Sequence, residues 1–373
     1  MQVIYRKYRP QKFSELVGQD HIVEVLTNAI KQGRVAHGYL FIGPRGTGKT
    51  STARILAKAL NCKGRSASSH SPEPCQTCEN CKAISKGVFF DLIELDAASN
   101  RGIDEVRNLK ESARVSFSRE HWKVFILDEA HSLTKDAANA LLKILEEPPE
   151  KTMFILITTE PEKIITTVKS RLQILPFRNL TIPDIVKRLS QIAKAEEIKI
   201  QENVLKVIAL NASGSLRDAE SNLAKVLSLG KQLVTLDDVR ETLGIIDEHL
   251  AMRFCDLLAK KEGEAVFDFL KGLHEKGIEP KAFLRTLLEY LRKLALMKIV
   301  PKASEELESY LTKEDISIII KQAEKLTQNE VLQWVEVFLQ ALQDVEKYPQ
   351  SQMALEIAVM KIINQVVRIK PAP

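Results

Sequence analysis

The segment GPRGTGKT, which runs from Gly43 to Thr50, has residue types and a spacing suited to holding a chain of phosphates. It matches the pattern G-x-x-x-x-G-K-T and lies between an apolar run and a helix-forming stretch. In such a loop the glycines let backbone N–H groups curl around phosphates, and the following helix presents its positive end. We therefore predict a nucleoside triphosphate site in which Lys49 reaches the β and γ phosphates and Thr50 is a ligand for Mg²⁺. The predicted contacts are Gly43, Pro44, Arg45, Gly46, Thr47, Gly48, Lys49, Thr50 and Ser51.

Two carboxylates at the end of the apolar run in KVFILDEAH would complete a hydrolytic site. Asp128 ends the run, where its carboxylate can reach the metal shell, so it is a second predicted magnesium ligand. Glu129 is the candidate general base for the water that attacks the γ phosphate. The letters DEAH also occur in a class of helicases, but those stack a second strand-alternating domain against the first. The second half of this sequence is helical, which argues against that class.

Four of the five cysteines lie in the segment CKGRSASSHSPEPCQTCENC, and a metal, a redox or a purely structural use has to be weighed. Their spacing, C-x12-C-x2-C-x2-C, brings Cys62, Cys75, Cys78 and Cys81 within reach of one tetrahedral Zn²⁺. Four thiolates leave no open position for water, so the predicted zinc site is structural. Two redox pairs or free thiols are the alternatives. Cys255 stands alone in a helical stretch and is interpreted as a small apolar side chain.

The composition indicates an ordinary globular protein of 373 residues, 45% hydrophobic and 28% charged. A net charge of +5 does not by itself identify a nucleic acid partner. No run of about twenty apolar residues could cross a bilayer. The start MQVIYRKYRP lacks the apolar core of a secretory signal. We therefore expect no membrane partner and a cytoplasmic location, where thiols stay reduced.

The elements that would position these groups follow an α/β rhythm in the first half of the chain. Short apolar runs alternate with amphipathic stretches, which predicts a mostly parallel sheet covered by helices. The predicted strands are 39–42, 91–95, 123–127, 153–158 and 173–177. Beyond residue 179 the pattern is helix after helix. We expect an α/β domain over 1–178 with the cysteine module 62–81 inserted, a small helical domain over 179–243, a second helical domain over 244–368, and a tail at 369–373.

With these motifs in order, the sequence resembles the AAA+ ATPases and, within them, the clamp-loader ATPases of DNA replication. The resemblance covers roughly residues 1–243 and includes YRKYRPQKFSELVGQ, GPRGTGKT, DEAHSLTKDAANALLKILEEPP, ITTEP, SRL and GSLRDA, together with the four-cysteine insertion. It implies an AAA+ P-loop domain with a parallel five-stranded sheet and an inserted zinc module. A small helical lid domain and an all-helical collar for ring assembly would follow.

The resemblance also implies three polar roles around the phosphates. Thr159, with Thr158 as the nearby alternative, would be a sensor that bonds the γ phosphate or the attacking water. Arg217 in GSLRDA would tie the lid to the nucleotide of the same subunit. Arg171 in SRL would be the arginine finger for the ATP of a neighbouring subunit. The family's usual triplet ends in Cys, and Leu172 departs from it without removing the arginine.

The same resemblance places the base of ATP near the N-terminal stretch, with Tyr8, Arg9, Pro10 and Val17 as contacts. This stretch also carries a basic cluster that a DNA backbone could use, and we favour the nucleotide pocket. Loader rings track primed DNA by phosphate contacts that weaken with salt. Lys143, after DEAH, and Arg101, in AASNRG, match positions of such contacts.

The function expected from these features is that of an ATP-hydrolysing motor subunit of a clamp loader. It would use ATP, Mg²⁺ and Zn²⁺, with other loader subunits, the sliding clamp and primed DNA as partners. A non-hydrolysing scaffold of the same fold is the alternative, and intact Lys49, Asp128 and Glu129 argue against it. Another AAA+ motor, such as a branch-migration helicase or an initiator, is disfavoured because no winged-helix-like C-terminal domain is recognised. No polymerase carboxylate site is recognised either.

Overall fold

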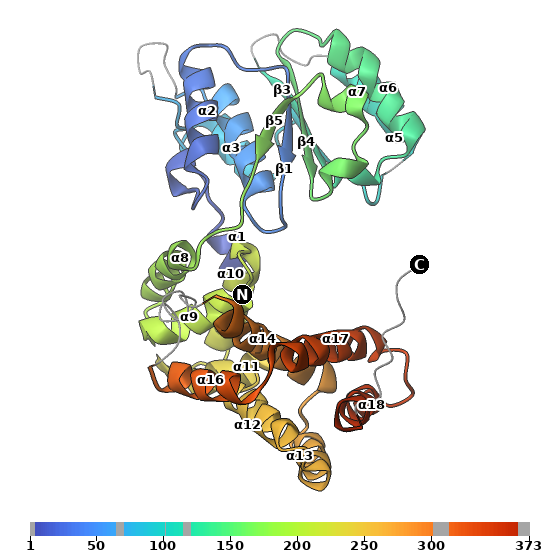
Figure 1. Ribbon diagram of the computed structural model, residues 1–373. Helices are drawn as coiled ribbons and strands as arrows, with labels where there is room; N and C mark the ends of the chain where they lie inside the picture. The colour runs from blue at the N-terminus through green and yellow to red at the C-terminus, as the bar shows by residue number, and fades with distance from the viewer. Residues whose placement is uncertain (1–3, 65–70, 101, 115–120, 301–312, 365–373) are drawn as a thin grey trace. The chain divides into compact units, whose positions relative to one another are not determined.

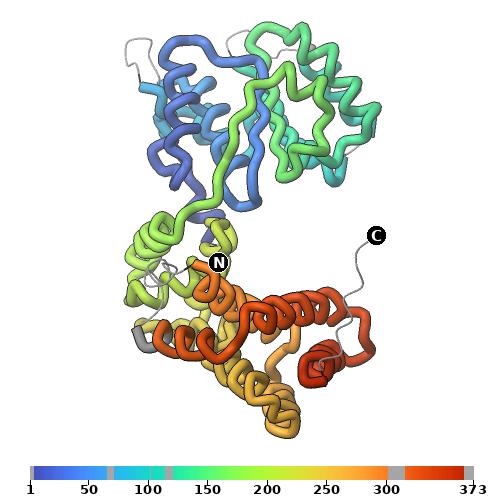
Figure 2. The backbone as a smooth tube through the Cα atoms, in the orientation of Figure 1, coloured from blue at the N-terminus to red at the C-terminus, as the bar shows by residue number. Residues whose placement is uncertain are grey.

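The structure is a computed structural model that describes residues 4–64, 71–100, 102–114, 121–300 and 313–364. The chain forms two compact units, Met1–Val239 and Arg240–Pro373. The first combines an α/β layer structure with a group of helices, and the described residues of the second are helical (Figures 1 and 2).

A parallel five-stranded sheet forms the centre of the described part of the first unit, in the order β2-β3-β4-β1-β5. Its strands are β1 (Gly38–Ile42), β2 (Leu92–Asp96), β3 (Lys123–Asp128), β4 (Thr152–Thr158) and β5 (Gln173–Pro176). The predicted sheet is thus confirmed. Because β4 lies between β1 and β3, the carboxyl ends of these three strands meet at one edge, and the register pairs Ile42 with Thr158. That edge is where open parallel sheets hold ligands.

Helices cover both faces of the sheet, since successive side chains of a strand point to opposite faces. Tyr39 and Phe41 pack in the core beneath α2 (Asp20–Lys31) and α3 (Lys49–Asn61). Leu40, between them in sequence, packs in the opposite core. That second core includes residues of α5 (Ile103–Arg114), α6 (Lys135–Glu146) and α7 (Thr166–Lys169). Figure 1 shows the resulting three layers, with α2 and α3 on one side of the sheet.

Short elements connect these layers. They are α1 (Ile4–Lys7), the 3₁₀ turns η1 (Phe13–Glu15), η2 (Ala130–Ser132) and η3 (Pro161–Lys163), and the helix α4 (Glu79–Lys86). Of the cysteines predicted to form a metal module, Cys62 caps the end of α3, Cys75 and Cys78 precede α4, and Cys81 lies in the first turn of α4, so the module is attached to the helix that follows the phosphate loop. Cys78 caps α4 by accepting a hydrogen bond from the Cys81 N–H.

A small group of helices completes the first unit, as predicted for a lid. It contains α8 (Ile182–Ala195), α9 (Glu202–Asn211) and α10 (Leu216–Leu227), and α11 (Leu236–Leu243) follows. A parallel pair of two-residue strands, β6 (Lys199–Ile200) and β7 (Leu233–Val234), was not expected from the sequence. The predicted domain boundary at 178 falls between β5 and α8, and the one at 243 falls at the end of α11.

The second unit is built from amphipathic helices around one core. Among its described residues the helices after α11 are α12 (Glu248–Ala259), α13 (Gly263–Glu275), α14 (Pro280–Ile299), α16 (Lys313–Lys325), α17 (Gln328–Asp344) and α18 (Gln352–Ile363). Phe254 meets Phe283 edge to face at 5.3 Å between ring centroids, and Cys255 is buried beside them. The predicted C-terminal helical domain is therefore confirmed. None of the described helices is long and apolar enough to span a bilayer.

Candidate active site and metal centre

The phosphate loop follows β1 directly and ends in the first turn of α3. Its glycines are required by backbone geometry: Gly46 and Gly48 have φ angles of 77° and 101°, in the left-handed region that favours glycine. A Cβ atom at Gly46 would stand 2.0 Å from Oγ of Ser215, which belongs to the lid. A Cβ at Gly43 would stand 2.3 Å from the carbonyl oxygen of Phe177. The loop can therefore adopt this path only with glycine at these positions.

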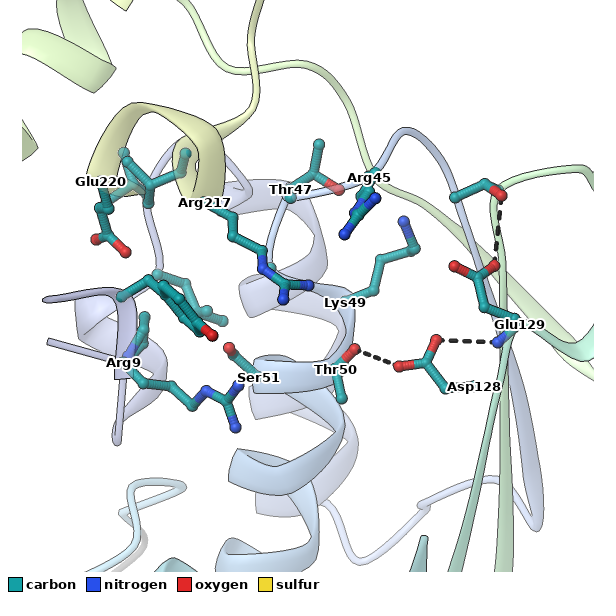
Figure 3. Close-up of a pocket in the computed structure, with 18 residues that line it drawn as sticks. Arg9, Arg45, Thr47, Lys49, Thr50, Ser51, Asp128, Glu129, Arg217 and Glu220 are labelled. Atoms are coloured by element: carbon teal, nitrogen blue, oxygen red, sulfur yellow. Dashed lines mark hydrogen bonds between the residues drawn. The ribbon is translucent and has the colours of Figure 1, made fainter. Parts of the chain in front are cut away.

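A cavity of about 340 Å³ lies over this loop, between the sheet edge, the N-terminal stretch and the lid (Figure 3). Its lining contains most of the residues predicted to bind nucleotide, brought together from five separate parts of the sequence. The lining residues are Tyr5, Arg9, Pro10, Leu16, Val17, Arg45, Gly46, Thr47, Gly48, Lys49, Thr50, Ser51, Asp128, Glu129, Thr159, Leu216, Arg217 and Glu220. The predicted contacts Gly43 and Pro44 do not line it; they lie in the loop behind Lys49.

Lys49 is buried at the base of the loop. Its Nζ donates hydrogen bonds to the carbonyl oxygens of Gly43, at 2.7 Å, and Pro44, at 2.6 Å. Burial lowers the pKa of Lys49 to about 8, against the opposing effect of Asp128 and Glu129. An ammonium group held on backbone carbonyls in this way is placed to exchange these partners for phosphate oxygens.

The predicted magnesium ligands meet. Oγ1 of Thr50 donates a hydrogen bond of 2.8 Å to Oδ2 of Asp128, and the N–H of Glu129 donates to Oδ1 at 3.0 Å (Figure 3). A hydroxyl and a carboxylate side by side are the hard oxygen donors that Mg²⁺ takes from proteins beside a nucleotide. The donor set therefore fits a magnesium ion.

Glu129, in a left-handed backbone conformation with φ of 50°, projects toward the end of β4. Oγ1 of Thr159 donates to its Oε2 at 3.4 Å. Of the two threonines considered as sensor, Thr159 lines the cavity, whereas Thr158 is fully buried. The sequence reasoning did not single out His131. Its Nδ1 lies 3.0 Å from Oγ1 of Thr158 and 3.4 Å from Oε2 of Glu129, and its Nε2 lies 3.1 Å from Oε1 of Glu160, so this imidazole lies between the two glutamates beside the end of β4.

The lid meets the phosphate loop directly. The N–H of Leu216 donates to the carbonyl oxygen of Gly46 at 3.1 Å, and Arg217 at the start of α10 extends into the cavity (Figure 3). The Arg217 guanidinium lies 5.0 Å from the centre of the Tyr5 ring. This cation–π contact joins the lid to the N-terminal stretch.

Of the four residues expected around the base, Arg9, Pro10 and Val17 line the cavity, and Tyr8 does not. The Tyr8 hydroxyl instead donates to Glu196 at 2.8 Å. Tyr5, three residues earlier, takes the lining position. Because α1 is a single turn, the sequence carries no periodicity that could choose between these two tyrosines.

Glu220 also lines the cavity without having been predicted. It is 5% exposed, and its Oε1 atom is buried with no hydrogen-bond partner among the described residues. The nearest cation is Arg188, whose Nε lies 3.5 Å away. Burial raises the pKa of Glu220 to about 7, although Arg188 and Arg9 lower it.

The remaining predicted residues lie outside the cavity. Arg171 donates from Nε to Oε1 of Glu146 at 3.0 Å and from Nη1 to the Thr167 carbonyl oxygen at 2.6 Å. It thus lies just before the amino end of β5, whereas the phosphate loop follows the carboxyl end of the parallel strand β1, and it does not line the cavity of its own chain. Lys143 is an exposed residue of α6. Arg101 falls outside the described residues.

The four predicted zinc ligands converge. The Sγ atoms of Cys62, Cys75, Cys78 and Cys81 all lie within 4.8 Å of one another. A Zn–S distance of about 2.3 Å in a tetrahedron separates sulfurs by about 3.8 Å, so only small movements would close the site. The N–H groups of Cys75 and Cys78 each point at a preceding sulfur, at 3.3 Å. A hydrogen bond from the Thr77 hydroxyl is the main cause that lowers the pKa of Cys75 to about 5, and the N–H of Cys78 acts in the same direction, whereas burial raises the pKa of Cys81. The donor set fits a structural zinc ion.

Three protein families match successive parts of the chain. The family described as "DNA polymerase III, delta subunit" matches residues 18–181. "DNA polymerase III clamp loader subunit, ATPase lid domain" matches residues 184–232. "DNA polymerase III subunits gamma and tau domain III" matches residues 234–371.

Similar proteins extend over most of the chain. DNA polymerase III subunit tau of Bacillus subtilis (strain 168) is 37% identical over 97% of this chain and 63% of its own length. The tau subunit of Escherichia coli (strain K12) is 38% identical over 81% of this chain and 46% of its own. The gamma subunit of Buchnera aphidicola is 33% identical over 97% of this chain and 96% of its own. The chain thus spans about half to two thirds of the tau relatives and almost all of the gamma relative.

Solved structures of lower similarity were also found. The Thermotoga maritima RuvB Holliday junction branch migration motor is 18% identical, with a TM-score of 0.49, over 67% of this chain and 79% of that chain. The Bacillus subtilis DNA clamp loader delta protein is 15% identical, with a TM-score of 0.39, over 91% of this chain and 99% of that chain.

Proposed function

This chain belongs to the DNA polymerase III gamma/tau family, and on that premise we propose that it is an ATP-hydrolysing motor subunit of a bacterial clamp loader. Loading would place the sliding clamp on primed DNA during replication. Its partners would be the delta and delta-prime loader subunits, further gamma/tau copies, the clamp and DNA. The work would take place in the cytoplasm.

The observation that carries the proposal is the convergence of Lys49, the Thr50–Asp128 pair and Glu129 on one cavity. A non-hydrolysing scaffold of the same fold would need to bind nucleotide at most. It would have no use for a carboxylate held 3.4 Å from a threonine hydroxyl at the strand edge beside the phosphate loop. This pairing favours the motor over the scaffold.

Hydrolysis would proceed by in-line attack of water on the γ phosphorus. The water oxygen forms the new P–O bond, the bond from the γ phosphorus to the bridging oxygen of ADP breaks, and Glu129 accepts the water proton. Lys49 would hold the β and γ phosphates, and Thr159 would orient the water beside Glu129. Thr50 and Asp128 would hold Mg²⁺, which neutralises charge on the phosphate oxygens when it is bound.

The residues around the purine base of ATP and the lid would form the second half of the nucleotide site. Arg9, Pro10 and Val17 present apolar and planar groups suited to a purine ring, and Arg217 reaches the cavity from α10. Arg217 would bind the phosphates of ATP, so bound ATP would join the lid to the phosphate loop. ATP binding would in this way set the orientation of the lid.

Turnover would require a neighbouring subunit. Arg171 pairs with Glu146 of its own chain and does not bind its own nucleotide site. To act on the nucleotide of a neighbouring chain, its guanidinium would exchange Glu146 for the γ phosphate of that chain. An arginine finger supplied in trans is worth roughly 10³- to 10⁵-fold in rate. The helical second unit would provide the collar through which the subunits form a ring, and the four cysteines would hold a structural Zn²⁺.

The test is an ATPase assay of the chain alone and in an assembled loader. We expect slow hydrolysis by the isolated chain and a large rise when partner loader subunits, cognate clamp and primed DNA are all present. A loader whose turnover does not depend on adding this chain would support the scaffold instead.

A further inference from the structure

The N-terminal strap, residues 9–17, lies between the nucleotide cavity and the cysteine module. Arg9 and Pro10 at its start and Leu16 and Val17 at its end line the nucleotide cavity. Between them, the backbones of Gln11, Phe13 and Ser14 are hydrogen-bonded to side chains of the cysteine module, and this part of the strap includes the 3₁₀ turn η1. The position of the strap therefore decides the shape of the base side of the cavity, and the module is placed to set that position.

Glu73 of the module holds the turn by its backbone. Its Oε2 accepts from the N–H of Phe13 and its Oε1 from the N–H of Ser14, both at 2.8 Å. These are the first amides of η1, which have no partner within a helix of this length. Bonds from N–H groups to a carboxylate are among the stronger hydrogen bonds in proteins. The Phe13 side chain is 1% exposed in the core, so the turn cannot shift without breaking both contacts or leaving that core.

Gln76 makes the second connection. Its Nε2 donates to the carbonyl oxygen of Gln11 at 2.6 Å, and its Oε1 accepts from Lys58 at 3.1 Å. Lys58, buried on α3, also donates to the side chain of Gln11. Gln76 has a φ of 62°, a left-handed conformation that is uncommon for a residue other than glycine. Strain of this kind persists where the surroundings impose it.

The thiol cluster supplies those surroundings. Glu73 lies two residues before Cys75 and Gln76 directly follows it, and the N–H groups of Cys75 and Cys78 each donate to a cysteine sulfur at 3.3 Å. Gln76 thus lies between two residues whose backbone bonds to the thiol cluster, while its own side chain bonds to the strap. Fixing the four sulfurs fixes the segment that carries both Glu73 and Gln76.

We propose that the cysteine module holds the N-terminal strap in the conformation that forms the base side of the cavity, with Glu73 and Gln76 as positioning residues. The expected effect on ATP affinity rests on the proposed nucleotide site. The hydrogen bonds from the module to the strap do not depend on that proposal. The module then stabilises the substrate-binding conformation of the strap in addition to being a structural zinc site.

Glu79 offers a matched control on the same module. It also carries a carboxylate, but that group pairs with Lys63 at 3.0 Å and is 87% exposed. Removing Glu79 changes the charge of the module without touching the strap. A difference between Glu73→Ala and Glu79→Ala therefore reports the contact with the strap, not the charge.

The experiment measures hydrogen exchange at the amides of Phe13 and Ser14, the dissociation constant for ATP, and KM and kcat in the assembled loader. Glu73→Ala should speed exchange at both amides and weaken ATP binding by about tenfold, the order expected for the loss of two charge-assisted bonds that hold the strap. KM should rise while kcat at saturating ATP stays unchanged, because the catalytic groups are untouched. Glu73→Gln, which keeps one acceptor, should recover part of the affinity, and Glu79→Ala should match the wild type.

A second arm uses the unmodified chain and a zinc chelator, without nucleotide. Loss of metal should speed exchange at the Phe13 and Ser14 amides while the amides of β3 and β4 keep their protection. Unchanged exchange at Phe13 and Ser14 in both Glu73→Ala and the chelated chain would overturn the proposal. If the wild type failed to bind ATP at all, the proposed function would fail, and the exchange data would still decide whether the module holds the strap.

Discussion

The hydroxyl of Thr50 donates a 2.8 Å hydrogen bond to Oδ2 of Asp128, across 78 positions of sequence. Thr50 lies in the first turn of α3, after the phosphate loop that follows β1. Asp128 ends β3, and β4 lies between β3 and β1 in the sheet. This bond brings together the two oxygen donors of the proposed magnesium site. The order of the strands therefore preorganises this edge of the sheet, and Thr159, the proposed sensor, directly follows β4, the strand between β1 and β3.

Buried Glu220 leads to a prediction about pH. Its pKa is raised to about 7 by burial, with Arg188 and Arg9 as the charged groups that face it. A carboxyl whose folded pKa lies above its unfolded value stabilises the fold fully at low pH and loses this contribution as pH rises through about 7. The free energy of unfolding of the wild type, relative to Glu220→Gln, should fall by about 3 kcal/mol between about pH 4.5 and pH 8.

Urea unfolding of both proteins across this range measures that difference. Glu202→Gln, which removes an exposed carboxylate of α9, is the control and should show no such trend. A difference between wild type and Glu220→Gln that stays constant with pH would show that Glu220 is ionised throughout.

The cysteine cluster should bind one metal ion. We expect about one equivalent of zinc per chain, and Cys81→Ser should lose it, because a hydroxyl is a poor replacement for a thiolate ligand. Cys255→Ser replaces another buried cysteine, in the core of the second unit, and should keep the full equivalent. Metal analysis of the purified proteins is the measurement. Less than about half an equivalent in the wild type, with all thiols titratable, would exclude the site.

Arg171 should matter only in the assembled loader. Arg171→Ala should bind ATP as the wild type does and lose roughly 10³-fold or more of the assembly-dependent turnover, since the finger acts on a neighbour's nucleotide. Glu146→Gln, which frees Arg171 from its ion pair, should retain that turnover. Lys169→Ala removes a nearby cation on α7 as a control. Full activity of an assembled Arg171→Ala loader would refute the trans role.

Lys143 should contribute to DNA binding through phosphate. Lys143→Ala should retain basal ATPase activity, lower the DNA-stimulated rate, and reduce the slope of log affinity against log salt by about 0.9, the value for one lost contact with duplex phosphate. Lys187→Ala, an equal change of charge on α8, is the control. Stimulation equal to the wild type at every salt concentration would remove Lys143 from the interface.

The sheet and the phosphate loop could be predicted from sequence for a physical reason. Strands buried on both faces appear as short apolar runs, and a loop that wraps phosphates requires glycines at fixed positions. The pairing of Asp128 with Thr50 followed from the same reasoning, because the carboxyl ends of parallel strands meet at one edge. The cysteine spacing likewise predicted the observed convergence of four sulfurs.

Contacts that depend on tertiary placement could not be predicted. Tyr5 and Tyr8 lie on one short turn, and only the position of the lid decides that Tyr5 meets Arg217 while Tyr8 meets Glu196. Glu220 lies on an amphipathic helix where a carboxylate suggests a solvated face, yet it is buried beside Arg188. The bonds from Glu73 to the strap span about sixty positions and have no local pattern.

The most direct measurement of the central claim compares wild type and Glu129→Gln in a loader assembled with clamp and primed DNA. Glutamine keeps the size and the contact with Thr159 but cannot accept the proton of the attacking water. We predict that ATP binds with unchanged affinity while steady-state hydrolysis falls by roughly 10²-fold or more. Hydrolysis by the Glu129→Gln loader at the wild-type rate would contradict the account of this chain as the hydrolysing motor.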